Sequence, residues 1–480
     1  MLSLHQDFKI TDLNGTLNAS EINAKIDAVS QILAGINFKV MGVLMDNTID
    51  WVILDLYAHR QNKTFVPIPS FFTAQQKQFL IEKAKVELFI SHDQNLNVSL
   101  GFDNDYFFLD DMVISNKANL LAKNQSNFQK ISFTSGTTSE PKGVELSSEG
   151  QWEVAKGLLN QLQDLNLRKH MSLLPFGVLL ENIGGVYTMT QSGGELIVLP
   201  TMEVGLLGSS QFDVDQCFEA LIKHKPESII LLPNMLEAMV NYLHLHPRDT
   251  SFLKFIAVGG AKTSKNLLED AENLGLPVYE GYGLTECYSV VTVNSPKQKL
   301  IGSVGQALPN RNIRINDQKE IEIEIKYPFK YLDRKQHEAG WFKTGDLGFF
   351  QNGCLVIEGR SKNILITSFG RNVSPEWPES LLNEHPEIYQ SCVTCFDQSF
   401  LSAIIVPYDN SLSFVDLEEL IILTNTKLPD YAQIKSYLIC PQPFSFEDQT
   451  LTINGRLKRD NILRKFQDQQ FNHIEEREIA

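Results

Sequence analysis

The chain carries, between residues 131 and 146, the sequence Ile131-Ser-Phe-Thr-Ser-Gly-Thr-Thr-Ser-Glu-Pro-Lys-Gly-Val-Glu-Leu146. Six of the seven residues from Phe133 to Ser139 carry a hydroxyl group or are glycine, and one cation, Lys142, follows them. Hydroxyls and free backbone N–H groups around a glycine can surround phosphate oxygens, and a lysine supplies a point charge. The stretch therefore predicts a phosphate-binding loop, whose candidate ligands are Thr134, Ser135, Gly136, Thr137, Thr138 and Lys142.

This loop is not a Walker loop, which has a glycine directly before its lysine, a Ser or Thr after it, and then a helix. Here Pro141 precedes Lys142 and Gly143 follows it. Because short apolar runs flank the loop, we expect the order strand, loop, strand, with a helix beginning only at Ser148 as its N-cap. The alternative interpretation is a polar surface loop that binds nothing.

Outward from the loop, apolar runs alternate with helix-like patterns. Strand-like runs lie at Val40–Met45, Thr64–Ile68 and Glu87–Ser91, and helix-like spacing separates them at Ile49–Arg60 and Thr73–Lys85. Strands that alternate with helices predict a sheet flanked by helices. The fold class is therefore α/β in this part of the chain.

The pattern changes beyond residue 310. Ile313–Ile315 and Ile321–Ile325 alternate strictly between apolar and polar residues around the turn Asn316-Asp317, which predicts an antiparallel hairpin. We expect a large N-terminal domain over residues 1–358 with mixed sheets and a β-rich end, a hinge at 359–362, and a smaller, mobile α+β domain over 363–480.

Composition narrows the classes of function. The 480 residues carry a net charge of −16 and are 43% hydrophobic, which is a globular profile that disfavours binding to nucleic acid or an anionic membrane surface. Six cysteines form no disulfide framework, the ten histidines form no zinc-like cluster, and no apolar run is long enough to span a membrane. Since the N-terminus also lacks the pattern of a signal peptide, we expect a cytoplasmic protein.

Five further motifs follow the loop in order. They are Tyr282-Gly-Leu-Thr-Glu286, Thr344-Gly-Asp346, Gly359-Arg360, Phe369-Gly-Arg-Asn-Val-Ser-Pro375 and Thr452-Ile-Asn-Gly-Arg-Leu-Lys-Arg459. Together with the loop, this series resembles the motifs of the adenylate-forming superfamily, which includes acyl-CoA synthetases, peptide-synthetase adenylation domains and luciferases. The stretch Leu174-Pro-Phe-Gly-Val-Leu-Leu-Glu-Asn182 is most similar to long-chain acyl-CoA synthetases, which implies a fatty acid as substrate.

The resemblance implies two half-reactions that use ATP, Mg²⁺ and coenzyme A. A carboxylate attacks the α-phosphorus of ATP to give acyl-AMP and pyrophosphate, and a thiol then displaces AMP. By resemblance, Thr285 contacts the α-phosphate and Glu286 holds Mg²⁺. The adenosine side is implied to comprise Gly259, Gly260, Tyr282 and Gly283 around adenine, and Asp346 and Arg360 at the ribose. Lys362 is implied as the hinge and Gly370 as part of the path for coenzyme A.

The acid pocket is expected between the 174–186 segment and the Gly259-Gly260 turn. Its apolar lining is expected to include Phe176, Val178, Leu179, Leu180 and Ile183. No lone charge there indicates an amino-acid substrate.

The chain departs from the family pattern at two positions. Ser139 stands where the loop usually has a glycine, and Arg456 stands where the family has its C-terminal catalytic lysine. Arginine is planar and bidentate, so it does not simply replace lysine. Lys458 lies two residues further on and would share the face of Arg456 in a strand, so both remain candidates. Two rival functions also remain open: an acyl-AMP ligase that loads a carrier protein or an amine, and a nucleotide-binding protein that has lost adenylation.

Overall fold

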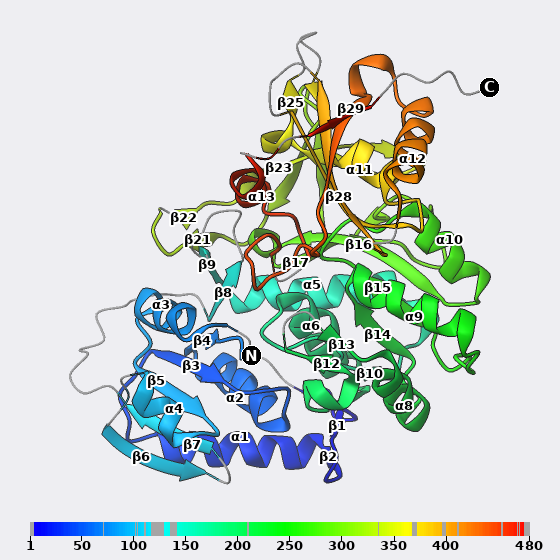
Figure 1. The fold of residues 1–480 in the computed structure, drawn as a ribbon. Helices are drawn as coiled ribbons and strands as arrows, with labels where there is room; N and C mark the ends of the chain where they lie inside the picture. The colour runs from blue at the N-terminus through cyan, green and yellow to red at the C-terminus, as the bar shows by residue number, and fades with distance from the viewer. Residues whose placement is uncertain are drawn as a thin grey trace.

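The computed structural model describes the chain from residue 4 to residue 474 with gaps. The described residues are 4–70, 72–100, 102, 104–109, 112–116, 129–134, 142–208, 211–334, 336–366, 372–395, 400–409, 412–452, 455–467, 469 and 471–474. Within them, two nine-stranded sheets form the lower part of the molecule and a four-stranded sheet forms the centre of the upper part (Figure 1).

The first large sheet holds the strands on either side of the loop. Its order is β22-β21-β9-β8-β4-β3-β5-β7-β6. The bounds are β3 Val40–Leu44, β4 Thr64–Pro67, β5 Leu88–Ser91, β6 Asn104–Leu109, β7 Met112–Asn116, β8 Lys130–Thr134, β9 Lys142–Leu146, β21 Phe329–Tyr331 and β22 Gln336–His337. Strands β8 and β9 pair antiparallel, with Thr134 opposite Lys142, so the predicted strand–loop–strand order is confirmed.

The second large sheet has the order β18-β17-β16-β15-β14-β10-β11-β1-β2. Its bounds are β1 Lys9–Thr11, β2 Thr16–Asn18, β10 Lys169–Met171, β11 Glu195–Ile197, β14 Ser228–Leu231, β15 Phe255–Val258, β16 Val278–Leu284, β17 Ser289–Val293 and β18 Gln306–Ala307. Strands β10, β14, β15 and β16 run parallel, so their carboxyl ends meet at one edge of the sheet.

Helices cover both large sheets. They are α1 Ala19–Leu33, α2 Ile49–Arg60, α3 Ala74–Ala84, α4 Gln94–Ser99, α5 Ser148–Gln161, α6 Leu179–Glu181, the π-helical turn η2 Asn182–Tyr187, α7 Thr188–Ser192, α8 Val214–His224, α9 Pro233–Leu245 and α10 Lys265–Asn273. Helix α5 has Ser147, not the predicted Ser148, as its N-cap, because the Ser147 hydroxyl accepts the N–H of Gly150.

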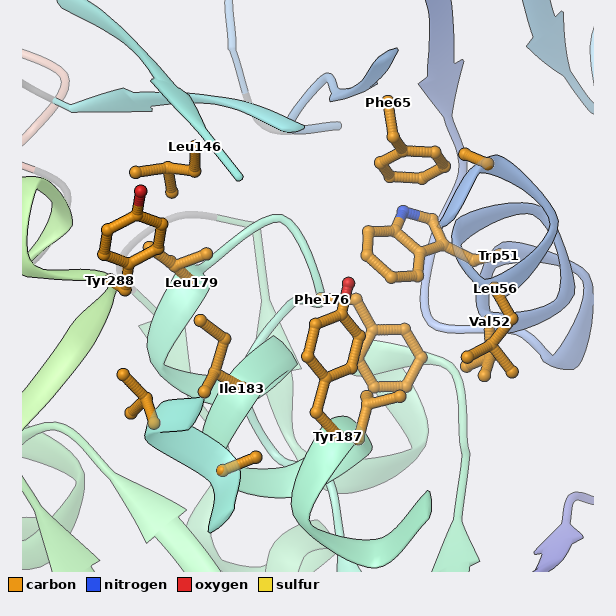
Figure 2. Close-up of a cluster of buried hydrophobic side chains, with 14 of the residues drawn as sticks. Trp51, Val52, Leu56, Phe65, Leu146, Phe176, Leu179, Ile183, Tyr187 and Tyr288 are labelled. Carbon is orange, nitrogen blue, oxygen red and sulfur yellow. The ribbon is translucent and has the colours of Figure 1, made fainter. Parts of the chain in front are cut away.

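One hydrophobic core lies between the two large sheets. It joins residues of β3 and β5 to residues of η2 and β17. Figure 2 shows Leu179, Ile183 and Tyr187 in it, with Phe176 beside Tyr187 and with Trp51 packed against Phe176 and Phe65. A buried ion pair crosses this core, since Lys130 Nζ lies 2.9 Å from Asp55 Oδ1 and donates to the Tyr187 hydroxyl at 2.8 Å. The strand before the loop is thereby fixed to the segment that carries the expected acid pocket.

Two smaller sheets follow. The predicted hairpin is present as β19 Ile313–Ile315 and β20 Glu320–Ile325, which form a four-stranded sheet with β23 Gly340–Gln351 and β24 Cys354–Arg360. The upper four-stranded sheet consists of β27 Ile388–Thr394, β28 Leu401–Pro407, β29 Ile434–Ile439 and β30 Asn472–His473, packed with α11 Glu376–Leu382, α12 Phe414–Thr426 and α13 Arg459–Phe466. Two short ladders pair β12 Leu206–Leu207 with β13 Gln211–Phe212, and β25 Leu365–Ile366 with β26 Asn372–Val373.

The residues after 364 have apolar clusters of their own. The mixed α/β class with a second, smaller α+β part is therefore confirmed, while the boundary at 359–362 and its movement stay predictions. Within the described residues, no helix combines the length and apolar character that crossing a membrane requires.

Candidate active site

A cavity of about 940 Å³ lies at the carboxyl ends of β14, β15 and β16. It is lined by the large part of the chain, before the expected hinge at 359–362, and by the small part after it. The large part contributes the turn after β15 and the 281–286 segment, and the small part contributes Thr452, Arg456 and Leu457. In Figure 1 helix α13, in dark red, lies between the upper sheet and strands β16 and β17. Residues of the predicted motifs that lie more than three hundred positions apart in sequence, such as Lys142 and Arg456, thus meet at one place.

The end of the cavity that is expected to hold adenosine is formed by the turn after β15 and by the carboxyl half of β16. Gly259 and Gly260 follow β15 and line the cavity, and Gly260 has a φ of +92°, a conformation that favours glycine. Tyr282 lines the cavity at the carboxyl half of β16, and its hydroxyl donates to Asp346 Oδ2 at 2.6 Å. Burial first, and then Asp346, raise the pKa of Tyr282 well above its usual value, so the phenol remains a donor.

Asp346 is held from two sides. Arg360 Nε lies 2.8 Å from Asp346 Oδ1, and the two residues are opposite each other in the β23–β24 pair. Both carboxylate oxygens of Asp346 therefore have partners, and the residue lies behind the cavity wall, to which Arg360 contributes directly. The role of Asp346 as a ribose acceptor stays a prediction.

Thr285 and Glu286 line the cavity in a short 3₁₀ turn, η4 Thr285–Cys287. The Tyr331 hydroxyl donates to Glu286 Oε1 at 2.7 Å, and burial, followed by Glu286, raises the pKa of Tyr331 above its usual value. This bond orients the Glu286 carboxylate, which lines the cavity. Among the described residues, no group of three or more His, Cys, Asp or Glu side chains forms a metal site.

Of the predicted phosphate loop, the structure describes the two ends, Thr134 and Lys142. Lys142 lines the cavity, and Thr134 ends β8 opposite it. Ser135, Gly136, Thr137, Thr138 and Ser139 lie outside the described residues, so their predicted roles stay predictions.

Arg456, not Lys458, enters the cavity. Arg456 Nε donates to the carbonyl oxygen of Gly260 at 2.6 Å. Burial lowers the pKa of Arg456, as does Arg360, and the nearby Asp346, Tyr282 and Glu286 oppose that shift. The geometry therefore supports Arg456 as the residue at the position of the family lysine.

Lys458 is directed elsewhere. Its Nζ lies 5.7 Å from the centre of the Phe446 ring, and the side chain is buried outside the cavity lining. Leu457 forms an isolated antiparallel bridge with Leu451, and Lys458 is then the N-cap of α13. Lys458 does not line the cavity, so a role for it in the site stays a prediction.

The hinge candidate Lys362 lies in a 3₁₀ turn, η5 Ser361–Asn363, at the edge of the cavity. Gly370, the candidate for the coenzyme A path, lies outside the described residues.

On the acid side the prediction is correct in part. Val178, Leu179 and Leu180 line the cavity, whereas Phe176 and Ile183 face the core between the sheets. Apolar character alone could not separate the two groups, because core residues and the residues that line an apolar pocket are of the same types.

The cavity continues past these residues to a polar end that the sequence did not reveal. His170 and Ser228 line it there, with His170 Nδ1 2.9 Å from Ser228 Oγ and His170 Nε2 2.8 Å from Glu181 Oε1. Tyr331, which orients Glu286, was also missed. In both cases the partners are far apart in the chain or on different elements, so no local spacing marks them.

The family model described as AMP-binding enzyme matches residues 5–324. The chain is 27% identical to an indoleacetate–CoA ligase of Aromatoleum aromaticum over 69% of this chain and 66% of that protein. It is 30% identical to a 2-succinylbenzoate–CoA ligase of Listeria monocytogenes over 70% of each. It is 24% identical to the long-chain-fatty-acid–CoA ligase FadD15 of Mycobacterium bovis over 73% of this chain and 70% of that protein. The chain thus spans about two thirds of the length of these relatives.

Solved structures share the fold over nearly the whole chain. The o-succinylbenzoate CoA synthetase of Bacillus subtilis in complex with an acyl-adenylate intermediate superposes with a TM-score of 0.75 at 18% identity, covering 98% of this chain and 96% of that one. The same enzyme in complex with ATP and magnesium ion superposes with a TM-score of 0.74 at 19% identity, covering 94% and 96%.

Proposed function

The chain belongs to the AMP-binding enzyme family and is an acid–thiol ligase of the AMP-forming type, and we propose that it activates an acid with an apolar chain as its acyl-adenylate and transfers the acyl group to coenzyme A. The observation that carries the proposal is the position of Arg456 against Gly260, in the cavity that Tyr282, Glu286 and Lys142 also line.

In the first half-reaction a carboxylate oxygen forms a bond to the α-phosphorus, and the bond from that phosphorus to the bridging oxygen breaks, so pyrophosphate leaves. Both reactants are anions, which makes charge neutralisation the main task of the site. Arg456 is placed to receive the carboxylate and the α-phosphate, and Lys142 the outer phosphates. Tyr282 offers a flat face to adenine, and Arg360 lies at the ribose end.

Glu286 is the residue that would hold Mg²⁺, because its carboxylate is a hard oxygen ligand in the cavity and Mg²⁺ takes its remaining ligands from phosphate and water. The ion would supply positive charge to the phosphates. A single protein carboxylate fits that use, and Tyr331 fixes its orientation.

In the second half-reaction the thiol sulfur forms a bond to the acyl carbon, and the bond from that carbon to the AMP oxygen breaks. We propose coenzyme A as the thiol because the relatives above are named CoA ligases. We propose an apolar chain in the acid because Val178, Leu179 and Leu180 line that side of the cavity. The names of the three relatives refer to three different acids, so the fatty-acid expectation is supported by one of them alone.

The test is exchange of labelled pyrophosphate into ATP in the presence of a panel of acids. The proposal predicts exchange that depends on an added acid. Product analysis with and without coenzyme A then separates a CoA ligase from a ligase that loads a carrier protein or an amine. ATP binding with no exchange for any acid would identify a nucleotide-binding protein without adenylation activity and would refute the proposal.

A further inference from the structure

The acid side of the cavity runs along the face of the second large sheet. Gly259 faces Leu180 of α6, and two residues back along β15 Ala257 lies opposite Ile230 of β14, which meets Gly184 of η2. Two residues further back Phe255 lies opposite Ser228, and Ser228 lies opposite His170 of β10. From Gly259 to Phe255 is four residues of strand, or about 13 Å.

The wall changes from apolar to polar along this path. Its middle is formed by Leu180, Ile230 and Ala257, and the far end presents Ser228 and His170 among the side chains of Leu158, Leu162 and Met189. Ser228 is 3% exposed and His170 is 2% exposed, so neither is solvated from outside. A buried polar pair in an apolar tunnel needs hydrogen-bond partners.

His170 is fully engaged, but Ser228 is not. The carboxylate of Glu181 accepts from His170 Nε2 at 2.8 Å and from the N–H of Leu174 at 3.2 Å. The buried Glu181 carboxylate and the buried His170 ring therefore both have hydrogen-bond partners. The Ser228 hydroxyl makes one hydrogen bond among the described residues, to His170 Nδ1. Because His170 Nε2 carries the proton that Glu181 accepts, Nδ1 accepts the Ser228 proton, and the Ser228 oxygen, which lines the cavity, retains acceptor capacity.

The distribution of charged side chains disfavours a substrate that carries a second carboxylate at this end of the cavity. The lysines and arginines that line the cavity within the described chain come from β9, from residues 334–362 and from residues 456–459, all at the nucleotide end. Glu181 lies directly behind His170. An anionic group would therefore lose its hydration without gaining a cation.

We infer that the substrate is an acid with an apolar chain that bears a neutral hydroxyl group about 13 Å from its carboxyl group, and that this hydroxyl donates a hydrogen bond to Ser228 Oγ. The inference rests on the proposed function and names the substrate class of the same site. An acid whose acyl chain ends in a methyl group would leave the Ser228 oxygen without this hydrogen bond. We therefore expect kcat/KM for that acid to be about tenfold lower than for the matching hydroxy acid.

The experiment compares straight-chain acids of matched length, one ending in a hydroxyl and the other in a methyl group, by the rate of pyrophosphate release. The parent enzyme is expected to prefer the hydroxy acid by about tenfold. Ser228→Ala is expected to bring the ratio close to one by losing activity on the hydroxy acid alone. Ser172→Ala is the matched control, because Ser172 is a buried serine directly after β10 that does not line the cavity, so the preference should persist.

Calorimetric binding of the two matching acyl-sulfamoyl-adenosines gives the same ratio without turnover. If acids support pyrophosphate release but the parent shows no preference at any length, or Ser228→Ala keeps the preference, the inference is wrong while the proposed function stands. If no acid supports release and neither analogue binds, the proposed function fails and the inference fails with it.

Discussion

Arg456 places a guanidinium where the two anions of the first half-reaction would meet, and its Nε is anchored to Gly260. We expect Arg456→Ala to lower acid-dependent pyrophosphate exchange by about 100-fold to 1,000-fold, the usual cost of removing one group that stabilises transition-state charge. We assign this side chain to the carboxylate and the α-phosphate and not to adenosine, so the Kd for ATP should change much less than the exchange rate. Exchange rates and ATP titrations with the purified variant measure both.

Lys458→Ala is the control for this prediction, since Lys458 lies against Phe446 outside the cavity. We expect it to retain exchange within a few-fold of the parent. An inactive Lys458→Ala beside an active Arg456→Ala would reverse the assignment and would mean that the small part of the chain meets the cavity differently during adenylation.

Glu280 is a buried carboxyl in β16, and burial raises its pKa to about 7, against the opposing hydrogen bond from the Thr263 N–H. Its pKa in the unfolded chain is the usual 4.5. Between these values the folded state holds the proton and the unfolded state does not, so this group lowers the free energy of unfolding as pH rises from about 4.5 to about 7. The full effect is about 3 kcal/mol.

Glu280→Gln removes this titration and keeps an acceptor for the Thr263 N–H. Denaturant unfolding of both proteins between pH 5 and pH 7.5 gives the difference in stability at each pH. We expect the variant to gain on the parent as pH rises across that window. A constant difference, or one that shrinks with pH, would show that Glu280 is charged in the folded protein.

At the scale of elements, periodicity and turn residues predicted most of the architecture. Helix α2 has the predicted bounds, and the hairpin at 313–325 forms as expected, because strict alternation of apolar and polar residues is typical of a strand with one buried face. Which apolar residues between 174 and 186 line the pocket could not be predicted. Phe176 and Ile183 pack in the core between the sheets, and apolar character alone does not distinguish a core residue from a pocket residue.

Gly184 of η2 lines the acid path beside Ile230. A Cβ at this position would lie 3.0 Å from Ile230 Cδ1, so a larger side chain must displace Ile230 or enter the cavity. We expect Gly184→Val to shift the preferred acid to shorter chains by obstructing the passage before Ser228, with adenylation of short acids retained. Chain-length profiles of pyrophosphate release measure the shift, and a thermal unfolding curve like that of the parent confirms the fold. An unchanged profile would mean that the acid takes another route.

At the scale of the molecule, hydrogen bonds among the described residues join the small part of the chain to the large part with Arg456 in the cavity. One is the Arg456–Gly260 hydrogen bond, and another is donated by the Tyr408 hydroxyl, directly after β28, to Glu237 of α9 at 2.6 Å. The motif order predicted that residues from both parts meet. The particular pairs, including Tyr331–Glu286 and His170–Ser228, could not be predicted, because they depend on strand register and not on spacing.

If the small part rotates about Lys362 between half-reactions, restricting that backbone should separate the two steps. Proline fixes φ and removes the N–H, so we expect Lys362→Pro to retain acid-dependent exchange and to lose most formation of the CoA thioester. Lys362→Ala, which keeps the backbone free, is expected to retain both. Equal loss of both steps in the proline variant would argue against the hinge assignment.

The most direct test of the whole account is a crystal structure of the protein bound to an acyl-sulfamoyl-adenosine. We predict adenine at Tyr282, the sulfamoyl group within hydrogen-bond distance of Arg456, and the acyl chain running past Leu180 and Ile230 toward Ser228. A complex with the nucleotide outside this cavity, or with Arg456 turned away from the sulfamoyl group and Lys458 in its place, would contradict it.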